Sequence, residues 1–288
     1  MRVLIIGCGY VGWPLAVRLA AEGHQVVGIR RSGGPDQSGV RFLQADITQP
    51  NDLSRLELPF DVVVNAVSST RGGVEEYRQV YLEGTRNILR WLASSPPVKY
   101  LYTSSTSVYA QNDGSWVDEF SPTDPESGTS RILVETEAEL LAAWRDSRFP
   151  AVILRVAGIY GPERGHLFKQ FLRGEATMRD DGVGYINSVH LDDVVGAIAH
   201  LIRAGKPGEV YNTVDNEPVT QREFFEWLSK KIGKPLPPAA PADPNRKRGL
   251  TNKRVSNLKL RTAGIEFRYP TFREGYSAEM ERLGIATT

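Results

Sequence analysis

The sequence predicts an α/β protein with a Rossmann-type doubly wound parallel sheet and a small mixed C-terminal substrate lobe. Short β-branched runs alternate with helix-period segments, and some runs, such as Val62-Val63-Val64, are apolar throughout, as in strands buried on both faces. A glycine-rich turn directly follows the first run. We therefore expect a dinucleotide-binding core over residues 1–155 and a mixed α/β lobe over 156–288, interleaved in one compact unit.

The expected strands and helices follow in chain order. Six strands are predicted, at residues 3–6, 25–29, 40–43, 61–66, 100–104 and 151–156. Helices are predicted at residues 10–21, 74–92, 131–144, 192–204 and 221–232. Pro14 falls near the start of the first helix, where a missing N–H costs little.

Composition excludes several classes of partner. The 35 Lys and Arg residues nearly balance 34 Asp and Glu residues, so no basic excess indicates a nucleic acid or a membrane surface. Cys8 is the single cysteine, and the four histidines show no ligand spacing, so we expect neither a disulfide nor a metal site. The apolar run at the N-terminus is short, and no later run reaches about 18 residues. These features favour a cytoplasmic enzyme-like protein.

The first candidate site is a G-x-G-x-x-G turn between a predicted strand and a predicted helix. It reads Gly7-Cys8-Gly9-Tyr10-Val11-Gly12. Gly7 would permit the tight turn, Gly9 would let a pyrophosphate approach the backbone, and Gly12 would let helix and strand pack closely. A structural turn without a ligand is the alternative, but the strand–turn–helix context favours dinucleotide binding.

The end of the second strand bears on which dinucleotide is bound. NAD-binding units usually carry an acidic residue there, whereas this chain has Arg30, Arg31 and Ser32. Guanidinium groups form charge-assisted bonds to phosphate, so these residues favour a ribose 2′-phosphate and hence NADP, with NAD still possible. The alternative is a pair of exposed loop arginines.

The ends of the third and fourth strands complete the expected cofactor site. Asp46, followed by Ile47, could accept a hydrogen bond from the adenine amino group or instead cap a helix. Ala66, Val67 and Ser68 follow the fourth strand at a sheet edge where ligands bind, and small residues there would let the cofactor ribose pass.

Further motifs give the chain a family resemblance. They are Gly84-Thr85-Arg86-Asn87, the segment from Tyr102 to Tyr109, Ser127 to Arg131 with Glu135, Arg155 with Gly158 to Pro162, Val189 to Asp193, and Tyr211-Asn212. Together these motifs resemble the extended short-chain dehydrogenases/reductases, the NAD-dependent epimerase/dehydratase group that acts largely on nucleotide sugars. The resemblance covers nearly the whole chain.

Three departures distinguish this chain from the family pattern. Ile6 stands where the family's glycine turn usually has one more glycine. Ser127 and Arg131 stand where the family has its catalytic Tyr and, four residues later, its Lys. The segment between Pro162 and Val189 is short, which suits a small or different substrate. The chain resembles most a divergent branch that lacks the Tyr–Lys pair.

The resemblance also implies roles for individual residues. Ser105 matches the family's third catalytic residue, which hydrogen-bonds the substrate oxygen, while Thr103 and Arg131 would contact the cofactor. Ser127 is too weak an acid to replace the Tyr directly, and Arg131 does not release a proton. The candidates for a replacement acid are Tyr109, Tyr102, His166 and His190.

Substrate contacts are expected from Ser68, Tyr160, His166 and His190. In the family, however, Arg155 and Tyr160 most often support the fold, and substrate contact is the alternative for both. For His190, which precedes Asp192 and Asp193, the alternative is a helix N-terminus with favourable carboxylates.

The function expected is that of an NAD(P)-dependent oxidoreductase or epimerase-like enzyme, acting on a carbonyl or sugar-nucleotide substrate with non-standard acid–base residues. The alternatives are a non-catalytic NADP-binding sensor and a structural protein with an empty pocket. A homodimer through the helices at 74–92 and 131–144 is implied by the resemblance. The basic residues Arg246 to Arg248, with Lys253-Arg254, follow a Pro-rich stretch and would either be solvated or contact an anion.

Overall fold

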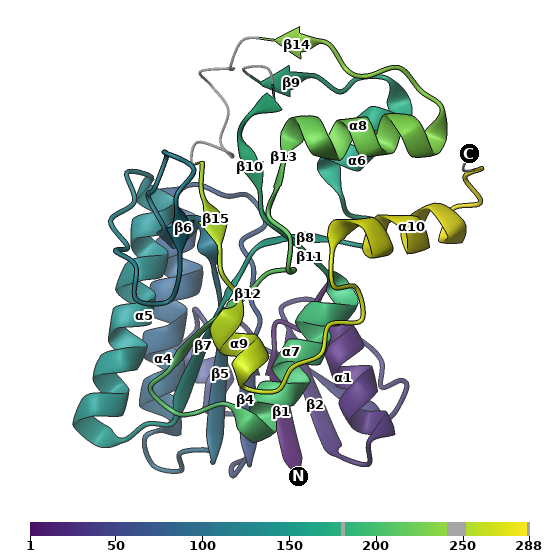
Figure 1. The fold of residues 1–288 in the computed structure, drawn as a ribbon. Helices are drawn as coiled ribbons and strands as arrows, with labels where there is room; N and C mark the ends of the chain where they lie inside the picture. Colours follow the sequence, from purple (N-terminus) through teal and green to yellow (C-terminus); the bar gives the residue numbers. More distant parts are fainter. Residues whose placement is uncertain (180–181, 241–251, 287–288) are drawn as a thin grey trace. The chain divides into compact units, whose positions relative to one another are not determined.

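A computed structural model describes residues 1–179, 182–240 and 252–286. Its centre is a seven-stranded sheet in the order β12-β7-β5-β4-β1-β2-β3, the doubly wound arrangement predicted from sequence (Figure 1). The pairs β3–β2, β2–β1, β1–β4 and β4–β5 are parallel. The strands are β1 (Arg2–Ile6), β2 (Gln25–Arg30), β3 (Val40–Gln44), β4 (Val62–Asn65), β5 (Lys99–Ser105), β7 (Ala151–Val156) and β12 (Val210–Thr213).

The strand order determines which face of the sheet each connecting helix covers. The step from β1 to β2 and the step from β4 to β5 run in opposite directions, so right-handed crossovers place α1 and α4 on opposite faces. Arg203 of α7 forms an ion pair with Glu22 at the end of α1, which places these two helices side by side. The helices are α1 (Gly12–Ala21), α2 (Pro50–Leu53), α3 (Val74–Tyr77), α4 (Gly84–Leu92), α5 (Gly128–Ser147) and α7 (Leu191–Ala204).

A π-helical segment interrupts the helix expected at residues 74–92. The chain runs through α3, the π segment η1 (Arg78–Glu83) and α4 without a break. A π turn needs one more residue than an α turn, and such segments are often found at functional sites. The apolar spacing predicts a continuous helix here, and it does not distinguish the wider turn.

The chain divides into two compact units. The first comprises residues 1–108, 123–155 and 195–211, and the second comprises 109–122, 156–194 and 212–288. The chain therefore passes between them five times, once directly after Arg155.

The second unit is built from short paired strands and helices of 5 to 12 residues. Its core is aromatic and includes Phe168, Phe224, Phe225, Phe272 and Tyr276. The strand pairs are β6 (Trp116–Val117) with β15 (Arg254–Val255), β8 (Gly158–Tyr160) with β11 (Ser188–His190), β9 (Met178–Arg179) with β14 (Ala239–Ala240), and β10 (Tyr185–Ile186) with β13 (Val219–Thr220). The helices are α6 (His166–Arg173), α8 (Gln221–Ile232), α9 (Leu258–Thr262) and α10 (Phe272–Arg282).

Candidate functional site

The glycine turn after β1 is closed tightly by its neighbours. Gly7 has φ +81°, and a Cβ there would lie 2.7 Å from the Cα of Val67. A Cβ on Gly12 would lie 2.4 Å from the carbonyl oxygen of Gly7, whereas a Cβ on Gly9 would meet nothing closer than 4.0 Å. Gly7 and Gly12 therefore close the turn against its own chain, and Gly9 leaves space open beside the backbone.

The helix that leaves this turn suits an anion at its start. Val11 precedes α1 without a side-chain cap, and the first turn carries no acidic residue. The positive end of the helix dipole is therefore left without a side-chain counter-charge. Together with the space beside Gly9, these features fit the pyrophosphate of a dinucleotide. Tyr10 lies half-buried within the turn.

A glycine that sequence reasoning missed supports the same turn. A Cβ on Gly28, in β2, would lie 2.8 Å from the Sγ of Cys8. Cys8 is fully buried, and burial raises the pKa of its thiol to about 11, so this sulfur is an inert packing group. The packing of Cys8, from the turn after β1, and of Phe42, from β3, against β2 accounts for the glycine at this position.

The two arginines after β2 have different surroundings. The Nε of Arg30 donates to the carbonyl oxygen of Gly33, and its guanidinium lies 4.7 Å from the ring centre of Phe42. Arg31 is exposed and donates from Nη2 to the Oγ1 of Thr70 at 3.0 Å. Ser32 is exposed. Arg30 thus stabilises the turn after β2, and Arg31 reaches the loop after β4.

The loop after β3 is bound to helix α4. Asp46 accepts two hydrogen bonds from Thr48 on its Oδ1, at 2.9 Å from the amide and 2.8 Å from the hydroxyl. Asn87 donates to the carbonyl oxygen of Ile47 at 2.8 Å, and a Cβ on Gly84 would lie 2.6 Å from the Cδ1 of Ile47. Gly84 and Asn87 therefore hold the segment that carries the predicted adenine contacts.

The loop after β4 is organised by a residue that sequence reasoning missed. Glu76 accepts hydrogen bonds from the Ser69 hydroxyl at 2.6 Å and from the amides of Arg71 and Gly72 at 2.8 and 2.7 Å. These donors lower the pKa of Glu76 to about 2. The hydroxyl of Tyr81, in the π segment, accepts from the amide of Ser69 at 3.2 Å.

Two of the predicted catalytic residues, Ser105 and Ser127, lie at the end of β5 and just before α5, and a hydrogen bond between Ser130 and Ser107 links these two segments. The Oγ of Ser105 is half-buried and accepts from the amide of Ser107 at 3.1 Å, and Ser130 donates to the Oγ of Ser107 at 3.1 Å. Among the described residues, no acceptor binds the hydroxyl proton of Ser105. That proton is available to a substrate oxygen.

Ser127 and Arg131 lie at the start of α5. Ser127 precedes the helix, is exposed, and shares a hydrogen bond with the Thr129 hydroxyl at 2.9 Å. The Nε of Arg131 donates to the carbonyl oxygen of Pro125 at 3.0 Å, and within the described parts of the chain its guanidinium has no carboxylate partner. Thr103, on β5, donates to the carbonyl oxygen of Asn65 at 3.3 Å.

A buried ion pair lies next to this strand end. Arg155 donates to both oxygens of Glu137, at 3.2 Å from Nε and 2.7 Å from Nη2. The hydroxyl of Ser104 donates to the same carboxylate at 2.5 Å. The side chains of Arg155 and Glu137 are only 7% and 4% exposed. The burial and pairing of Arg155 favour a role in supporting the fold, as the resemblance implies.

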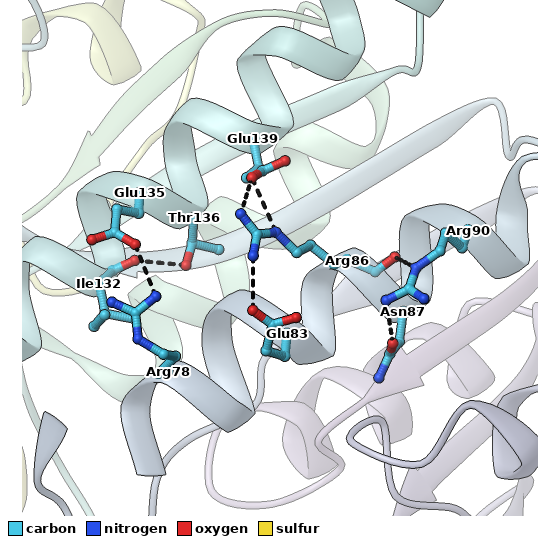
Figure 2. A network of polar contacts seen from close by, with 9 residues as sticks. All are labelled: Arg78, Glu83, Arg86, Asn87, Arg90, Ile132, Glu135, Thr136 and Glu139. Carbon is cyan, nitrogen blue, oxygen red and sulfur yellow. Dashed lines mark hydrogen bonds and ion pairs between the residues drawn. The ribbon is translucent and has the colours of Figure 1, made fainter. Parts of the chain in front are cut away.

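Surface ion pairs join the helices of the same region, as Figure 2 shows. Arg86 donates to Glu83 at 2.8 Å and, from Nε, to Glu139 of α5 at 3.0 Å. Arg78 donates to Glu135 at 3.2 Å. These contacts connect η1 and α4 to α5 within one chain. A homodimer through these helices stays a prediction.

Four further predicted residues, Tyr109, Tyr160, His166 and His190, belong to the second unit. Tyr109 is fully buried and donates to Asn212 at 2.8 Å. Tyr160 is 1% exposed and stacks on Tyr276, with ring centres 4.2 Å apart. His166 is exposed at the start of α6.

His190 is also buried, at 3% exposure. Its Nδ1 accepts from the amide of Asp192 at 3.1 Å, and its Nε2 lies 3.5 Å from a Glu279 oxygen. Burial lowers the pKa of His190. Burial and internal contacts favour the structural interpretation of Tyr109, Tyr160 and His190, and a substrate role for any of them stays a prediction.

The basic segment is described only in part. Arg246 to Arg248 lie outside the described residues. Arg254 donates to the carbonyl oxygen of Gly114 at 2.8 Å and lies 5.2 Å from the ring centre of Trp116, so its guanidinium makes internal contacts. Across residues 1–179, 182–240 and 252–286, no helix combines the length and apolarity needed to cross a bilayer. The same ranges hold no group of three potential metal ligands.

Comparison with known proteins agrees with this geometry. Residues 3–213 match the NAD dependent epimerase/dehydratase family. Protein YeeZ of Escherichia coli K12 is 29% identical over 93% of this chain and 96% of its own. A structure from Methylobacillus flagellatus, classed with the NAD-dependent epimerases/dehydratases, is 32% identical over 98% of both chains, with a TM-score of 0.81.

The fold is also shared with a more distant enzyme whose ligands are known. UDP-glucuronic acid 4-epimerase from Bacillus cereus, solved with UDP-glucuronic acid and NAD, superposes with a TM-score of 0.83 over 99% of both chains at 23% identity. The family match, the glycine turn and the sheet order lead to one conclusion. The chain belongs to the NAD dependent epimerase/dehydratase family.

Proposed function

We propose that this protein binds NADP(H) and catalyses hydride transfer at a carbonyl or alcohol carbon, in a nucleotide sugar or a smaller substrate. The observation that carries the proposal is the geometry of the glycine turn at the end of β1. Gly7 and Gly12 close the turn, Gly9 leaves space beside an uncapped helix start, and Arg31 follows β2 where NAD-binding units carry an acid.

Different residues of the first unit would bind different parts of the cofactor. The turn from Gly7 to Gly12 would hold the pyrophosphate, and Arg31 would bind the ribose 2′-phosphate. Arg131 would hold positive charge beside the nicotinamide ribose. When bound, the nicotinamide gives or takes the hydride at the substrate carbon.

Ser105 would polarise the substrate oxygen. Its oxygen accepts from the Ser107 amide, so its proton would be free to donate to the substrate carbonyl. Neither Ser127 nor Arg131 is suited to transfer the proton, since an unassisted serine is too weak an acid and a guanidinium stays protonated. A residue outside the family's Tyr–Lys pair, or water, would supply it.

A fluorescence titration with NADPH and, separately, NADH tests the cofactor assignment. We expect NADPH to bind at least about tenfold more tightly, which corresponds to about 1.4 kcal/mol. Equal affinities would refute the 2′-phosphate assignment. The absence of binding by either cofactor at millimolar concentration would refute the proposed function as a whole.

Ser105→Ala tests the catalytic assignment. After screening nucleotide sugars and simple carbonyl compounds for NADPH oxidation, we expect this variant to lower kcat by about 10²-fold while NADPH affinity stays unchanged. Ser147→Ala, at the far end of α5, is the matched control. Unchanged turnover in Ser105→Ala would remove Ser105 from the mechanism. If the wild type binds NADPH but oxidises it with no substrate in the screen, non-catalytic cofactor sensing becomes the better hypothesis.

A further inference from the structure

Arg31 and Thr70 meet across the end of the strand that carries the glycine turn. The sheet order is β2-β1-β4, so β1 lies between the strands that these residues follow. The 3.0 Å hydrogen bond from Arg31 Nη2 to Thr70 Oγ1 therefore joins the loops on either side of the turn. Topology thus places this contact at the carboxyl end of β1, where the turn begins.

Thr70 is in turn held by Glu76. The Thr70 hydroxyl lies 3.2 Å from the Oε1 of Glu76, and the Thr70 amide lies 3.4 Å from the same oxygen. The other carboxylate oxygen binds the Ser69 hydroxyl and the amides of Arg71 and Gly72. The one carboxylate of Glu76 therefore accepts hydrogen bonds from four consecutive residues of the loop, Ser69 to Gly72.

The direction of these bonds matters. A threonine hydroxyl has one proton, and because Glu76 accepts it, the lone pairs of Thr70 Oγ1 remain for Arg31. The two hydrogen bonds therefore run in one direction: Arg31 donates to Thr70, and Thr70 donates to Glu76. Each of these three side chains has a defined role, and the ionised Glu76 carboxylate can only accept hydrogen bonds.

We propose that Glu76, acting through Thr70, is a positioning residue that orients Arg31 toward the ribose 2′-phosphate and so sets the selectivity for NADPH over NADH. This inference rests on the proposed function and adds to it two residues outside the motifs that carry the family resemblance. Neither Thr70 nor Glu76 needs to contact the cofactor.

The test compares Thr70→Val, Thr70→Ser and Glu76→Gln with the wild type by titration with NADPH and NADH. Thr70→Val removes the acceptor for Arg31 while keeping the shape of the side chain, and we expect NADPH affinity to fall about fivefold, as for one lost hydrogen bond. NADH affinity should stay the same. Thr70→Ser should restore the wild-type ratio.

Glu76→Gln should shift the ratio in the same direction, because its amide N–H₂ would face backbone donors of the loop. Glu75→Gln is the matched control, since the Glu75 carboxylate accepts a hydrogen bond from Gln79, one turn further along the same helical run, at 3.0 Å. In an Arg31→Ala background, Thr70→Val should have no further effect on NADPH affinity.

Two results would overturn the inference. One is an unchanged NADPH-to-NADH ratio in both Thr70→Val and Glu76→Gln. The other is an equal loss of affinity for both cofactors, which would indicate a merely structural loop. Failure of the proposed function is a separate outcome, because it would show in the wild type as equal affinities or as no binding.

Discussion

Two glutamates of the first unit gather several donors, yet their surroundings differ. Glu137 is buried and binds Arg155 and Ser104 next to the end of β5. Glu76 lies at the surface, where it binds the loop after β4. Water competes for the donors of Glu76 but not for those of Glu137. The comparison teaches that the same chemistry stabilises the fold at one site and shapes a loop at the other.

Breaking the buried pair should have the largest effect. Arg155→Met leaves the Glu137 carboxylate buried with one hydroxyl partner, and we expect a loss of about 3–5 kcal/mol in the free energy of unfolding. Urea denaturation measures it. The control is Arg203→Met, which removes an exposed ion pair at 3.7 Å and should cost no more than about 1 kcal/mol. Similar losses in the two variants would contradict the dependence on burial.

The pH dependence of Asp215, a buried carboxyl with no ion-pair partner in the described part of the chain, extends the comparison. Asp215 is 2% exposed, and burial raises its pKa to about 8 although Ser188 and the Glu217 amide donate to it. In the unfolded chain the pKa is about 3.9. Between these values the folded state holds a proton that the unfolded state has lost, so this group makes stability fall as pH rises from about 4 to about 8.

Asp215→Asn should remove this dependence. We expect the free energy of unfolding of the variant, relative to wild type, to increase steadily as pH rises across that window. Urea denaturation at several pH values measures this difference. A difference that does not change with pH would show that Asp215 is ionised in the folded protein at neutral pH.

Glu76 should show the smallest effect on overall stability, with the opposite sign. Its folded pKa of about 2 lies below the unfolded value, so its contribution is present above about pH 4.5 and is lost as pH falls toward 2. We expect Glu76→Gln to leave the urea midpoint at pH 7 almost unchanged. The amide signals of Arg71 and Gly72 should shift in NMR spectra. A large change in the urea midpoint would contradict the expected difference in stability effect between Glu76 and Glu137.

Much of the first unit could be predicted because its signals are local in sequence. The expected strands at residues 3–6, 25–29 and 151–156 match β1, β2 and β7 within one residue at each end. The glycine turn is recognisable because backbone conformation and close packing select glycine within six residues. Helix α10 and the positions of the short strands of the second unit were not predicted, since such elements depend on packing partners elsewhere in the chain.

The sequence by itself determined the fold class, the glycine turn and the basic residues after β2, because each is encoded by neighbouring residues. The tertiary structure alone decided which of those arginines packs on Phe42 and which reaches Thr70, 39 residues away. It likewise decided that Glu76 organises a loop and that Glu137 neutralises Arg155. The physical reason is that a charged side chain is defined by its partners, and sheet order brings those partners together from distant parts of the chain.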